Sequence, residues 1–406
     1  MPGANDPHPW QGSFAARTAG LSASEVRALF AVASRPEVVS LAGGMPFVSA
    51  LPMELVTQAV ERTLRERGAE ALQYGSGQGS ADLRAHILDV MALEGIRAQV
   101  DDVVVTTGSQ HALELLAKLL LDPGDIVLAE GPTYVTALVV FQSFQAEVRH
   151  VPMDEHGLIP AALREQLESL AAAGRLPKFL YTVPTFNNPA GVTLSRLRRE
   201  EVLEIALEYG VLVVEDNPYG LLYFDSPPPN PLRSLESGGV VYLGTFSKTL
   251  APGMRVGWVL APHRIREKLI LANEAAILSP SSFTQLVVNE YLGSADWQGQ
   301  IATFRSVYRQ RRTALLAALE EHLPALSWTV PEGGFYVWLT LPDDVDAQAM
   351  LPRAVENLVA YTPGTAFYAD GGGRNKIRLS FSYPTPEFIR EGIRRLAETI
   401  GSEPSV

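Results

Sequence analysis

Short runs of consecutive apolar residues alternate with helix-like stretches through the middle of the chain. Such runs predict strands buried on both faces, because a strand with one exposed face alternates apolar and polar positions. The predicted strands span residues 102–106, 126–130, 179–183, 211–215, 240–243 and 257–260, with helices at 110–121, 134–144 and 196–209. This alternation predicts an α/β fold in which helices cover a mainly parallel sheet.

The pattern changes in the last third of the chain. A long helical stretch at 296–322 leads into the alternating strand Gly334–Leu339. A short strand at 377–381 and a helix at 386–400 follow. We therefore predict a smaller α+β domain over residues 291–406 after a large domain over 46–290. An N-terminal segment, residues 1–45 with a helix at 23–33, is expected to pack beside the small domain.

Composition narrows the class of protein. The 406 residues are 47% apolar, which is enough for a large core, and the net charge of −12 argues against nucleic acid or an anionic membrane as the main partner. The chain has no cysteine, which excludes disulfides and thiolate chemistry and fits the cytoplasm, the predicted location. No signal peptide or membrane span is predicted. The seven histidines are dispersed without ligand spacing, so no metal is expected.

Lysine is scarce, and one lysine has an unusual setting. Lys248 follows the apolar strand 240–243 and enters a loop of small and hydroxyl-bearing residues. The other lysines lie on predicted helices or just before predicted strands: Lys118, Lys178, Lys268 and Lys376. A lysine shielded from water has a lowered pKa and can form a Schiff base. Arg255, seven residues later, suits a phosphate, and pyridoxal 5'-phosphate (PLP) requires both groups.

Further candidate residues follow the predicted strands, at the edge where open parallel sheets bind ligands. Ser109 and Gln110 open a helix after the first strand, where backbone N–H groups favour an anion, although Ser109 can also be a simple helix cap. Tyr134 follows the next strand, where it can stack on a planar ring or only pack against the sheet.

Two later strands are followed by side chains that suit the rest of the same cofactor. Asn188 lies in an Asn-Pro-Ala-Gly turn and can donate to a phenolic oxygen or cap the turn. Asp216 follows an apolar strand, where it can cap a helix or hold a pyridine nitrogen protonated. Tyr219 lies in the same turn as Asp216 and can join Asn188 at the phenolic oxygen.

These motifs, taken in order, resemble those of a known family. Asn188-Pro-Ala-Gly, Asp216-x-x-Tyr219 and Ser247-Lys248 followed after six residues by Arg255 match the fold-type-I, class I/II PLP-dependent aminotransferases over essentially their whole length. Segments 40–46 and 378–382 are similar to the branch of α-aminoadipate (LysN-type) and kynurenine aminotransferases. The resemblance implies transfer of an amino group between an L-α-amino acid and a 2-oxo acid.

The resemblance also implies a role for each candidate in the chemistry. Lys248 would form the Schiff base and then move a proton between the substrate carbon and the cofactor. Asp216 would pair with the pyridine nitrogen, and Tyr219 and Asn188 would hold the phenolic oxygen. The implied catalytic residues are therefore Lys248, Asp216 and Tyr219.

The remaining implied roles concern binding. Tyr134 would stack on the cofactor ring. Arg378 would grip the substrate α-carboxylate through its planar fork, with Asn188 and Gly44 also touching the substrate. The phosphate would be bound by Ser109, Gln110, Ser247 and Arg255.

Tyr74 matches a tyrosine that the family lends to the phosphate of the neighbouring subunit, which implies a homodimer. One position departs from the family. In the α-aminoadipate enzymes an arginine that reads the distal carboxylate lies seven residues before the position of Arg27, and here that residue is Gly20, with Arg17 nearby. We therefore expect an apolar, aromatic or unusual amino donor, with 2-oxoglutarate or pyruvate as acceptor.

Two other functions compete with transamination. In transamination the substrate bound to PLP loses its Cα proton and forms a quinonoid. The same quinonoid can lead to β- or γ-elimination, replacement or oxidation, and the motifs alone do not separate these outcomes. Transcription regulators can also carry an aminotransferase-like sensor fused to a DNA-binding winged helix. The short segment before Ser40 and the acidic charge disfavour that alternative.

Overall fold

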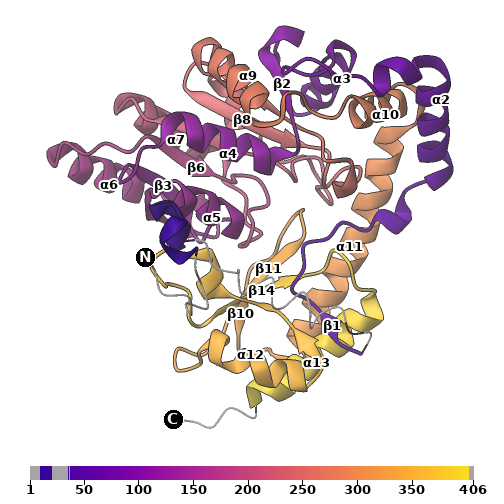
Figure 1. The fold of residues 1–406 in the computed structure, drawn as a ribbon. Coiled ribbons are helices and arrows are strands. Elements are labelled where there is room, and N and C mark those ends of the chain that lie inside the picture. Colours follow the sequence, from indigo (N-terminus) through magenta and orange to yellow (C-terminus); the bar gives the residue numbers. More distant parts are fainter. Residues whose placement is uncertain (1–9, 21–34, 36, 402–406) are drawn as a thin grey trace.

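The computed structural model describes residues 10–20, 35 and 37–401. The helix predicted at 23–33 lies outside these residues. None of the helices in the described ranges is long and apolar enough to cross a membrane. Figure 1 shows a helix-covered sheet joined by one long helix to a smaller sheet near the C-terminus.

The larger sheet has eight strands in the order β2-β9-β8-β7-β6-β3-β4-β5. Their bounds are β2 (Val103–Thr106), β3 (Ile126–Gly131), β4 (Glu147–Asp154), β5 (Gly157–Leu158), β6 (Phe179–Thr182), β7 (Leu212–Asp216), β8 (Val240–Thr245) and β9 (Gly257–Leu260). The neighbours from β8 through β4 pair in parallel, whereas β9 is antiparallel to both β2 and β8, and β5 is antiparallel to β4. The sheet is therefore mixed, but it is mainly parallel, as predicted.

The sheet is buried on both faces, as its apolar runs predict. On β3, Val127 and Ala129 face the helices α4 (Ser109–Leu120), α5 (Val135–Ser143) and α9 (His263–Ile277). Ile126 and Leu128 face the opposite helices, α6 (Pro160–Ala172) and α7 (Arg196–Glu208). Successive strand residues point to opposite faces, so a strand covered on both sides needs apolar residues at consecutive positions.

The other helices extend the fold at its two ends. α2 (Met53–Ala71) and α3 (Ala81–Ala92) pack against α10 (Ser282–Ser294), and α8 (Leu232–Leu235) is a single turn. The long α11 (Trp297–His322) runs from this group to the smaller sheet (Figure 1). There it packs against α13 (Pro386–Gly401), which also contacts α12 (Ala347–Glu356).

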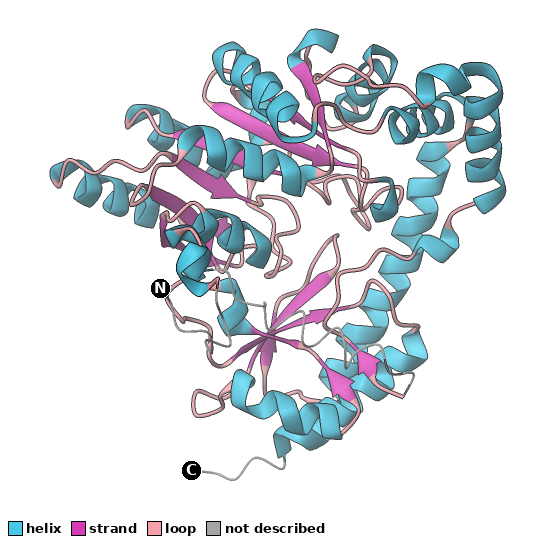
Figure 2. Ribbon diagram, viewed as in Figure 1, coloured by secondary structure: helices cyan, strands magenta, loops and turns pink. Residues whose placement is uncertain are grey.

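The smaller sheet is antiparallel, with the order β10-β11-β14-β13. Strands are magenta and helices cyan in Figure 2, where the smaller sheet lies below the larger one. Its strands are β10 (Ser327–Trp328), β11 (Tyr336–Thr340), β13 (Thr362–Pro363) and β14 (Lys376–Ser380). Beside it, β1 (Val39–Ser40) pairs in parallel with β12 (Val359–Ala360). The short 3-10 helices are η1 (Gln11–Ser13), η2 (Ala16–Gly20), η3 (Val48–Ala50), η4 (Val100–Asp102), η5 (Pro252–Met254) and η6 (Gly364–Phe367).

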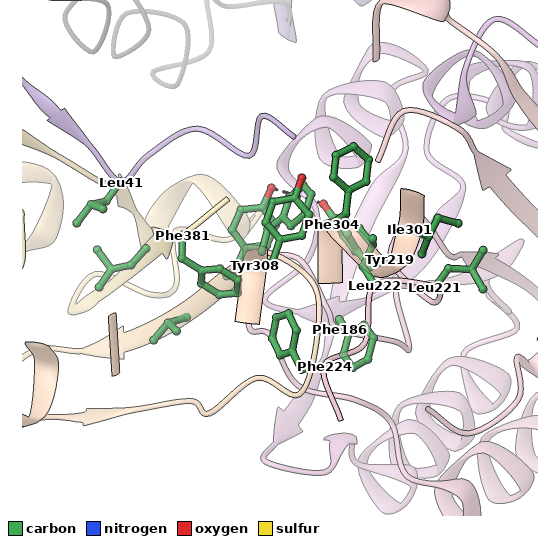
Figure 3. Packing of buried hydrophobic residues seen from close by; sticks show 14 of the residues in the cluster. Leu41, Phe186, Tyr219, Leu221, Leu222, Phe224, Ile301, Phe304, Tyr308 and Phe381 are labelled. Carbon is green, nitrogen blue, oxygen red and sulfur yellow. Dashed lines mark hydrogen bonds between the residues drawn. The ribbon is translucent and has the colours of Figure 1, made fainter. Parts of the chain in front are cut away.

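An aromatic cluster joins α11 to the strands of both sheets (Figure 3). The Tyr308 ring of α11 lies 5.9 Å from Phe304 and 4.8 Å from Phe335, measured between ring centroids. The Phe335 ring in turn lies 5.3 Å from Tyr219, which follows β7. This core is continuous across the two parts of the fold, so it does not mark where one domain ends and the next begins. The domain boundaries proposed from the sequence therefore stay a prediction.

The strands and helices predicted within the described residues are present, with ends that differ by one or two residues. The strand predicted from Gly334 begins at Tyr336, because Gly334 has a φ of 69°, which does not continue a strand. The strands β1, β4 and β5 and the helices α2, α3, α6, α8, α10 and α12 were not predicted.

Replacing Phe304 by Ala should lower the free energy of unfolding by about 3–5 kcal/mol, because its fully buried ring would leave a cavity in the shared core. Urea titration measures the loss. Leu197→Ala on α7 is the matched control, since Leu197 is 71% exposed, and it should change stability by less than about 0.5 kcal/mol. Equal losses in the two variants would contradict the assignment of this core.

Candidate functional site

One cavity of about 340 Å³ lies at the strand ends of the larger sheet. Its lining comes from the loops after β2, β3, β6, β7 and β8, together with β11, β14 and the segment after β1. The predicted site residues on its wall are Gly44, Ser109, Gln110, Tyr134, Asn188, Asp216, Tyr219, Ser247, Lys248, Arg255 and Arg378. Tyr74 lies elsewhere on the surface and is 77% exposed.

Lys248 projects from the loop after β8, and its Nζ donates a hydrogen bond of 3.1 Å to the carbonyl of Gly44. Burial lowers the pKa of Lys248 from its ordinary value, and the guanidinium groups of Arg378 and Arg255 act in the same direction. Asp216 opposes this shift without cancelling it. The amine is therefore easier to deprotonate than a surface lysine, as a Schiff-base lysine requires.

Asp216 ends β7 and has one satisfied and one open carboxylate oxygen. The Tyr181 hydroxyl donates to Oδ2 over 2.8 Å, whereas the buried Oδ1 has no partner among the described residues. Burial raises the pKa of Asp216 to about 6, although the hydrogen bond from Tyr181 and the charge of Lys248 act against the rise. A buried acceptor left open in this way suits a cationic donor on a ligand.

The sequence analysis did not identify Tyr181. Its ring is fully buried on β6, where the apolar run Phe179–Thr182 contains one hydroxyl-bearing aromatic residue. A buried tyrosine hydroxyl needs a hydrogen-bond partner. The place of Tyr181 in a buried strand was therefore the signal by which it could have been found. Which acidic group it bonds could not be read from the sequence, because Asp216 lies on a different strand.

A cradle for an anion forms where α4 begins. Gly108 precedes the helix with a φ of 80°, and no side chain caps the first turn. The Arg255 guanidinium passes so close that a Cβ on Gly108 would lie 2.7 Å from Nη2. Gly257 lies equally close to this turn, because a Cβ there would lie 2.6 Å from the backbone nitrogen of Ser109. Uncapped N–H groups, the helix dipole and the arginine together favour a phosphate.

Hydroxyl groups complete the cradle. The Thr245 hydroxyl lies 2.9 Å from the Ser247 hydroxyl, and both residues line the cavity. Thr245 was also missed in the sequence, although it ends β8 only two residues before Ser247. Gln110 and Tyr134 also line the cavity, with the tyrosine hydroxyl 3.5 Å from Oε1 of the glutamine.

Arg378 on β14 is buried and oriented by neutral groups. Its Nη1 donates to Asn188 Oδ1 over 2.8 Å, and its Nη2 donates to the carbonyl of Ala42 over 2.6 Å. Its Nε is buried without a partner among the described residues. The rings of Tyr336 and Phe367 lie 4.3 and 4.9 Å from the guanidinium carbon. This guanidinium keeps a free donor and an uncompensated charge, so it suits a carboxylate.

Tyr336 is a second wall residue that the sequence analysis did not select. Its hydroxyl lies 3.5 Å from that of Tyr219. A Cβ on Gly44 would lie 1.8 Å from the Tyr336 hydroxyl oxygen, so this ring leaves no room for a side chain at position 44. Burial raises the pKa of Tyr219 well above its usual range, which keeps the hydroxyl protonated as a donor.

These residues fit the cofactor predicted from the sequence. An open carboxylate oxygen, an anion cradle and a lysine with a lowered pKa line a single cavity, as a pyridine nitrogen, a phosphate and an aldehyde require. The described residues contain no group of three or more histidine or acidic side chains that could hold a metal ion.

Known proteins similar to this chain agree with the cofactor predicted for this cavity. Residues 37–396 match the family model for class I and II aminotransferases. The chain is 42% identical to aromatic-amino-acid aminotransferase 1 of Thermococcus litoralis over 96% of this chain and 94% of that protein. It is 38% identical to the 2-aminoadipate transaminase of Thermus thermophilus over 97% and 98% of the two chains.

A solved structure is similar over nearly the whole length. The kynurenine aminotransferase of Pyrococcus horikoshii, in complex with PMP, KYN and KYA, superimposes with a TM-score of 0.93 at 40% identity. The match covers 97% of this chain and 98% of that one.

Asp216 should make the cofactor-free protein less stable as pH rises. The folded protein holds the Asp216 proton to about pH 6, against 3.8 for the ordinary side chain, so charging the folded form costs free energy between these values. Asp216→Asn removes that cost. The variant should exceed the wild type by about 2–3 kcal/mol at pH 7, and the difference should nearly vanish near pH 4.

Urea unfolding at each pH, with cofactor removed, measures this difference. Asp344→Asn is the control, because Asp344 is exposed and its replacement should give no pH-dependent gain. A gain for Asp216→Asn that is the same at pH 4 and pH 7 would contradict the raised pKa.

Proposed function

Because the chain belongs to the class I and II aminotransferases, we propose a role for each residue of its cavity and a class of amino donor. The protein is a PLP-dependent aminotransferase, which moves an amino group between an amino acid and a 2-oxo acid. The observation that carries the assignment of roles is the arrangement of Lys248, the open oxygen of Asp216 and the start of α4 around one cavity.

Bound PLP supplies an aldehyde that condenses with amines and a ring that withdraws electrons from the substrate carbon. Asp216 would hold the ring nitrogen in its protonated state through Oδ1, and Tyr181 would keep that carboxylate oriented. Ser109, Gln110, Ser247 and Arg255 would bind the phosphate. This proposal is supported by the unpaired oxygen and by the uncapped helix that faces Arg255.

Lys248 would move the proton. Its lowered pKa favours the neutral amine, whose Nζ can accept a proton from the substrate carbon and return it elsewhere. Arg378 would bind the substrate α-carboxylate and so fix which bond faces Lys248. Asn188 and Tyr219 would orient the cofactor's phenolic oxygen, while the Tyr134 ring would cover its face and Gly44 would border the substrate.

The amino donor is proposed to be apolar, aromatic or unusual. Among the described residues of the cavity wall, the cations are Lys248, Arg255 and Arg378, and each already has a role. The remaining wall is largely uncharged, with Met45, Tyr134, Val135, Val183, Pro252 and Tyr336. At the position where the α-aminoadipate enzymes have an arginine for the distal carboxylate, this chain has Gly20, which ends η2 beside α5. Of the two nearby arginines, Arg17 is exposed and Arg27 lies outside the described residues. A 2-oxo acid such as 2-oxoglutarate or pyruvate would accept the amino group.

The assembly and the location are also proposals. A homodimer would bring Tyr74 to the phosphate of the neighbouring subunit, which is supported by the 77% exposure of this aromatic side chain. The predicted domains, 46–290 and 291–406 with the segment 1–45, remain part of this proposal. The absence of cysteine supports a reducing compartment such as the cytoplasm.

Lys248→Ala should abolish transamination, because no other lysine lines the cavity among the described residues. The wild type should be yellow, and borohydride should remove its absorbance band. Single amino acids added without a 2-oxo acid should leave as their oxo acids and convert the cofactor to its amine form. Aromatic and apolar amino acids should react faster than 2-aminoadipate.

Lys268→Ala on α9 is the matched control and should retain the band and the activity. A colourless wild-type protein would contradict the role of Lys248. Release of an eliminated or replaced product with unchanged cofactor would instead support the competing PLP chemistries.

Mixed dimers should reveal whether Tyr74 acts across the interface. Subunits with Lys248→Ala and subunits with Tyr74→Ala should each have low activity alone. In a mixed dimer, one site would combine an intact Lys248 with an intact Tyr74, so co-expression should restore up to about half of the wild-type rate per mixed dimer. Activity no higher than the average of the two variants would exclude the proposed sharing.

A further inference from the structure

His150 lies outside the cavity, between the larger sheet and the segment that backs Arg378. It is on β4, beside Ala129 of β3. Its Nδ1 lies 2.8 Å from the carbonyl oxygen of Glu130. Its Nε2 lies 2.8 Å from the backbone nitrogen of Ala369, which follows η6. One ring therefore connects strands of the larger sheet to a loop that is attached to the smaller one.

The chemistry of the two partners assigns the protonation of this ring. A backbone carbonyl only accepts, so Nδ1 carries the hydrogen and donates to Glu130. A backbone N–H only donates, so Nε2 offers its lone pair to Ala369. Both contacts together require a neutral imidazole in a single tautomer. The backbone of His150 is also fixed, because Gln166 on α6 donates to its carbonyl over 2.6 Å.

Close packing surrounds this contact. The Tyr368 ring lies 5.3 Å from the His150 ring in an edge-to-face arrangement. Gly131 passes beneath both rings, since a Cβ there would lie 2.9 Å from the His150 Cβ and 3.4 Å from the Tyr368 ring. A second hydrogen bond joins the same segments, from the Thr133 N–H to the carbonyl of Phe367 over 3.1 Å.

Phe367 links this contact to the cavity. Its fully buried ring lies 4.9 Å from the Arg378 guanidinium carbon and 5.5 Å from the Trp338 ring. The two hydrogen bonds at Phe367 and Ala369 flank Tyr368, so together they fix the end of the segment that carries the Phe367 ring. If the bond at Ala369 is lost, the ring behind Arg378 gains freedom.

We propose that His150 is a positioning residue for substrate binding: it ties residues 367–369 to the larger sheet and thereby holds Phe367 against Arg378. The inference rests on the proposed role of Arg378 in binding the substrate carboxylate. His150 touches neither substrate nor cofactor, because it does not line the cavity. Its loss should therefore weaken substrate binding without changing the cofactor.

Two substitutions test the hydrogen bonds of the two His150 ring nitrogens separately. In His150→Asn the side-chain NH₂ can still donate to Glu130 but cannot reach Ala369. In His150→Gln the longer side chain can place its oxygen near the former Nε2 and accept from Ala369. Both variants are neutral and polar. Asn keeps the bond to Glu130 and loses the bond to Ala369, whereas Gln keeps the bond to Ala369 and loses the bond to Glu130.

Steady-state kinetics of the holoenzyme, with its best amino donor and 2-oxo acid, provide the test. His150→Asn should raise KM for both substrates roughly 3- to 10-fold, the effect of one lost hydrogen bond on an equilibrium, with kcat changed less than about twofold. His150→Gln should restore KM to within about twofold of the wild type. The cofactor absorbance should be the same in all three proteins.

A second measurement follows the backbone directly. Hydrogen exchange of the peptide that contains Ala369 should be faster in His150→Asn than in the wild type and in His150→Gln. His156→Asn is the matched control, because His156 lies on the turn after β4 and is exposed, and it should alter neither KM nor exchange. Equal KM values in His150→Asn and the wild type, or equal losses in the Asn and Gln variants, would overturn the inference.

A further variant, Arg378→Lys, distinguishes failure of the inference about His150 from failure of the proposed function. If Arg378→Lys raises KM more than about tenfold while His150→Asn does not raise it, only the role of His150 is wrong. If Arg378→Lys leaves KM unchanged, the carboxylate-binding role of Arg378 is wrong and the inference about His150 is overturned with it.

Discussion

The cavity contains ionisable side chains that are largely removed from water and form no direct ion pair with any of the described residues. Lys248 bonds a backbone carbonyl, Asp216 bonds a tyrosine hydroxyl, and Arg378 bonds an amide oxygen and a backbone carbonyl. Each neutral partner orients its group but returns little of the hydration energy that burial removes. A ligand with complementary charges at the right places recovers that energy, so the same arrangement explains both the shifted pKa values of Lys248 and Asp216 and the choice of cofactor.

Glu215, the residue before Asp216, shows which partners a buried carboxylate has when its role is only structural. Glu215 precedes Asp216 on β7, and successive strand residues face opposite sides of the sheet. The Glu215 carboxylate accepts from two backbone N–H groups, those of Leu232 and Arg233, and lies 3.8 Å from the buried Arg199 guanidinium. The two adjacent acids therefore differ: the Glu215 carboxylate is bonded to the structure, whereas Asp216, which lines the cavity, has one oxygen without a partner among the described residues.

Sequence patterns predicted the parts of the fold that depend on local physics. The strands β2, β3, β6, β7, β8 and β9 are buried, mostly apolar runs, and most of the candidate site residues follow their ends, so both could be found without coordinates. β4 was missed because His150, Arg149 and Glu147 interrupt its apolar pattern. Tyr181 and Tyr336 could not be assigned because their contacts, with Asp216 and Gly44, join residues far apart in the chain. The direction of β9 was equally hidden, since an apolar run does not reveal whether a strand is parallel or antiparallel.

The segment around β1 has a consequence for how the protein is made. Leu41 donates to the carbonyl of Ala360 and accepts from the N–H of Ser380, while the Thr362 hydroxyl donates to Ala42, 320 residues away in sequence. A ribosome adds about 5–20 residues each second, so this stretch waits roughly 15–60 s for its partners. Gly44, which receives the Lys248 hydrogen bond, belongs to the same stretch. The wall of the cavity that contains Gly44 can therefore be fixed only after partners such as Thr362, 320 residues after Ala42, have been synthesised.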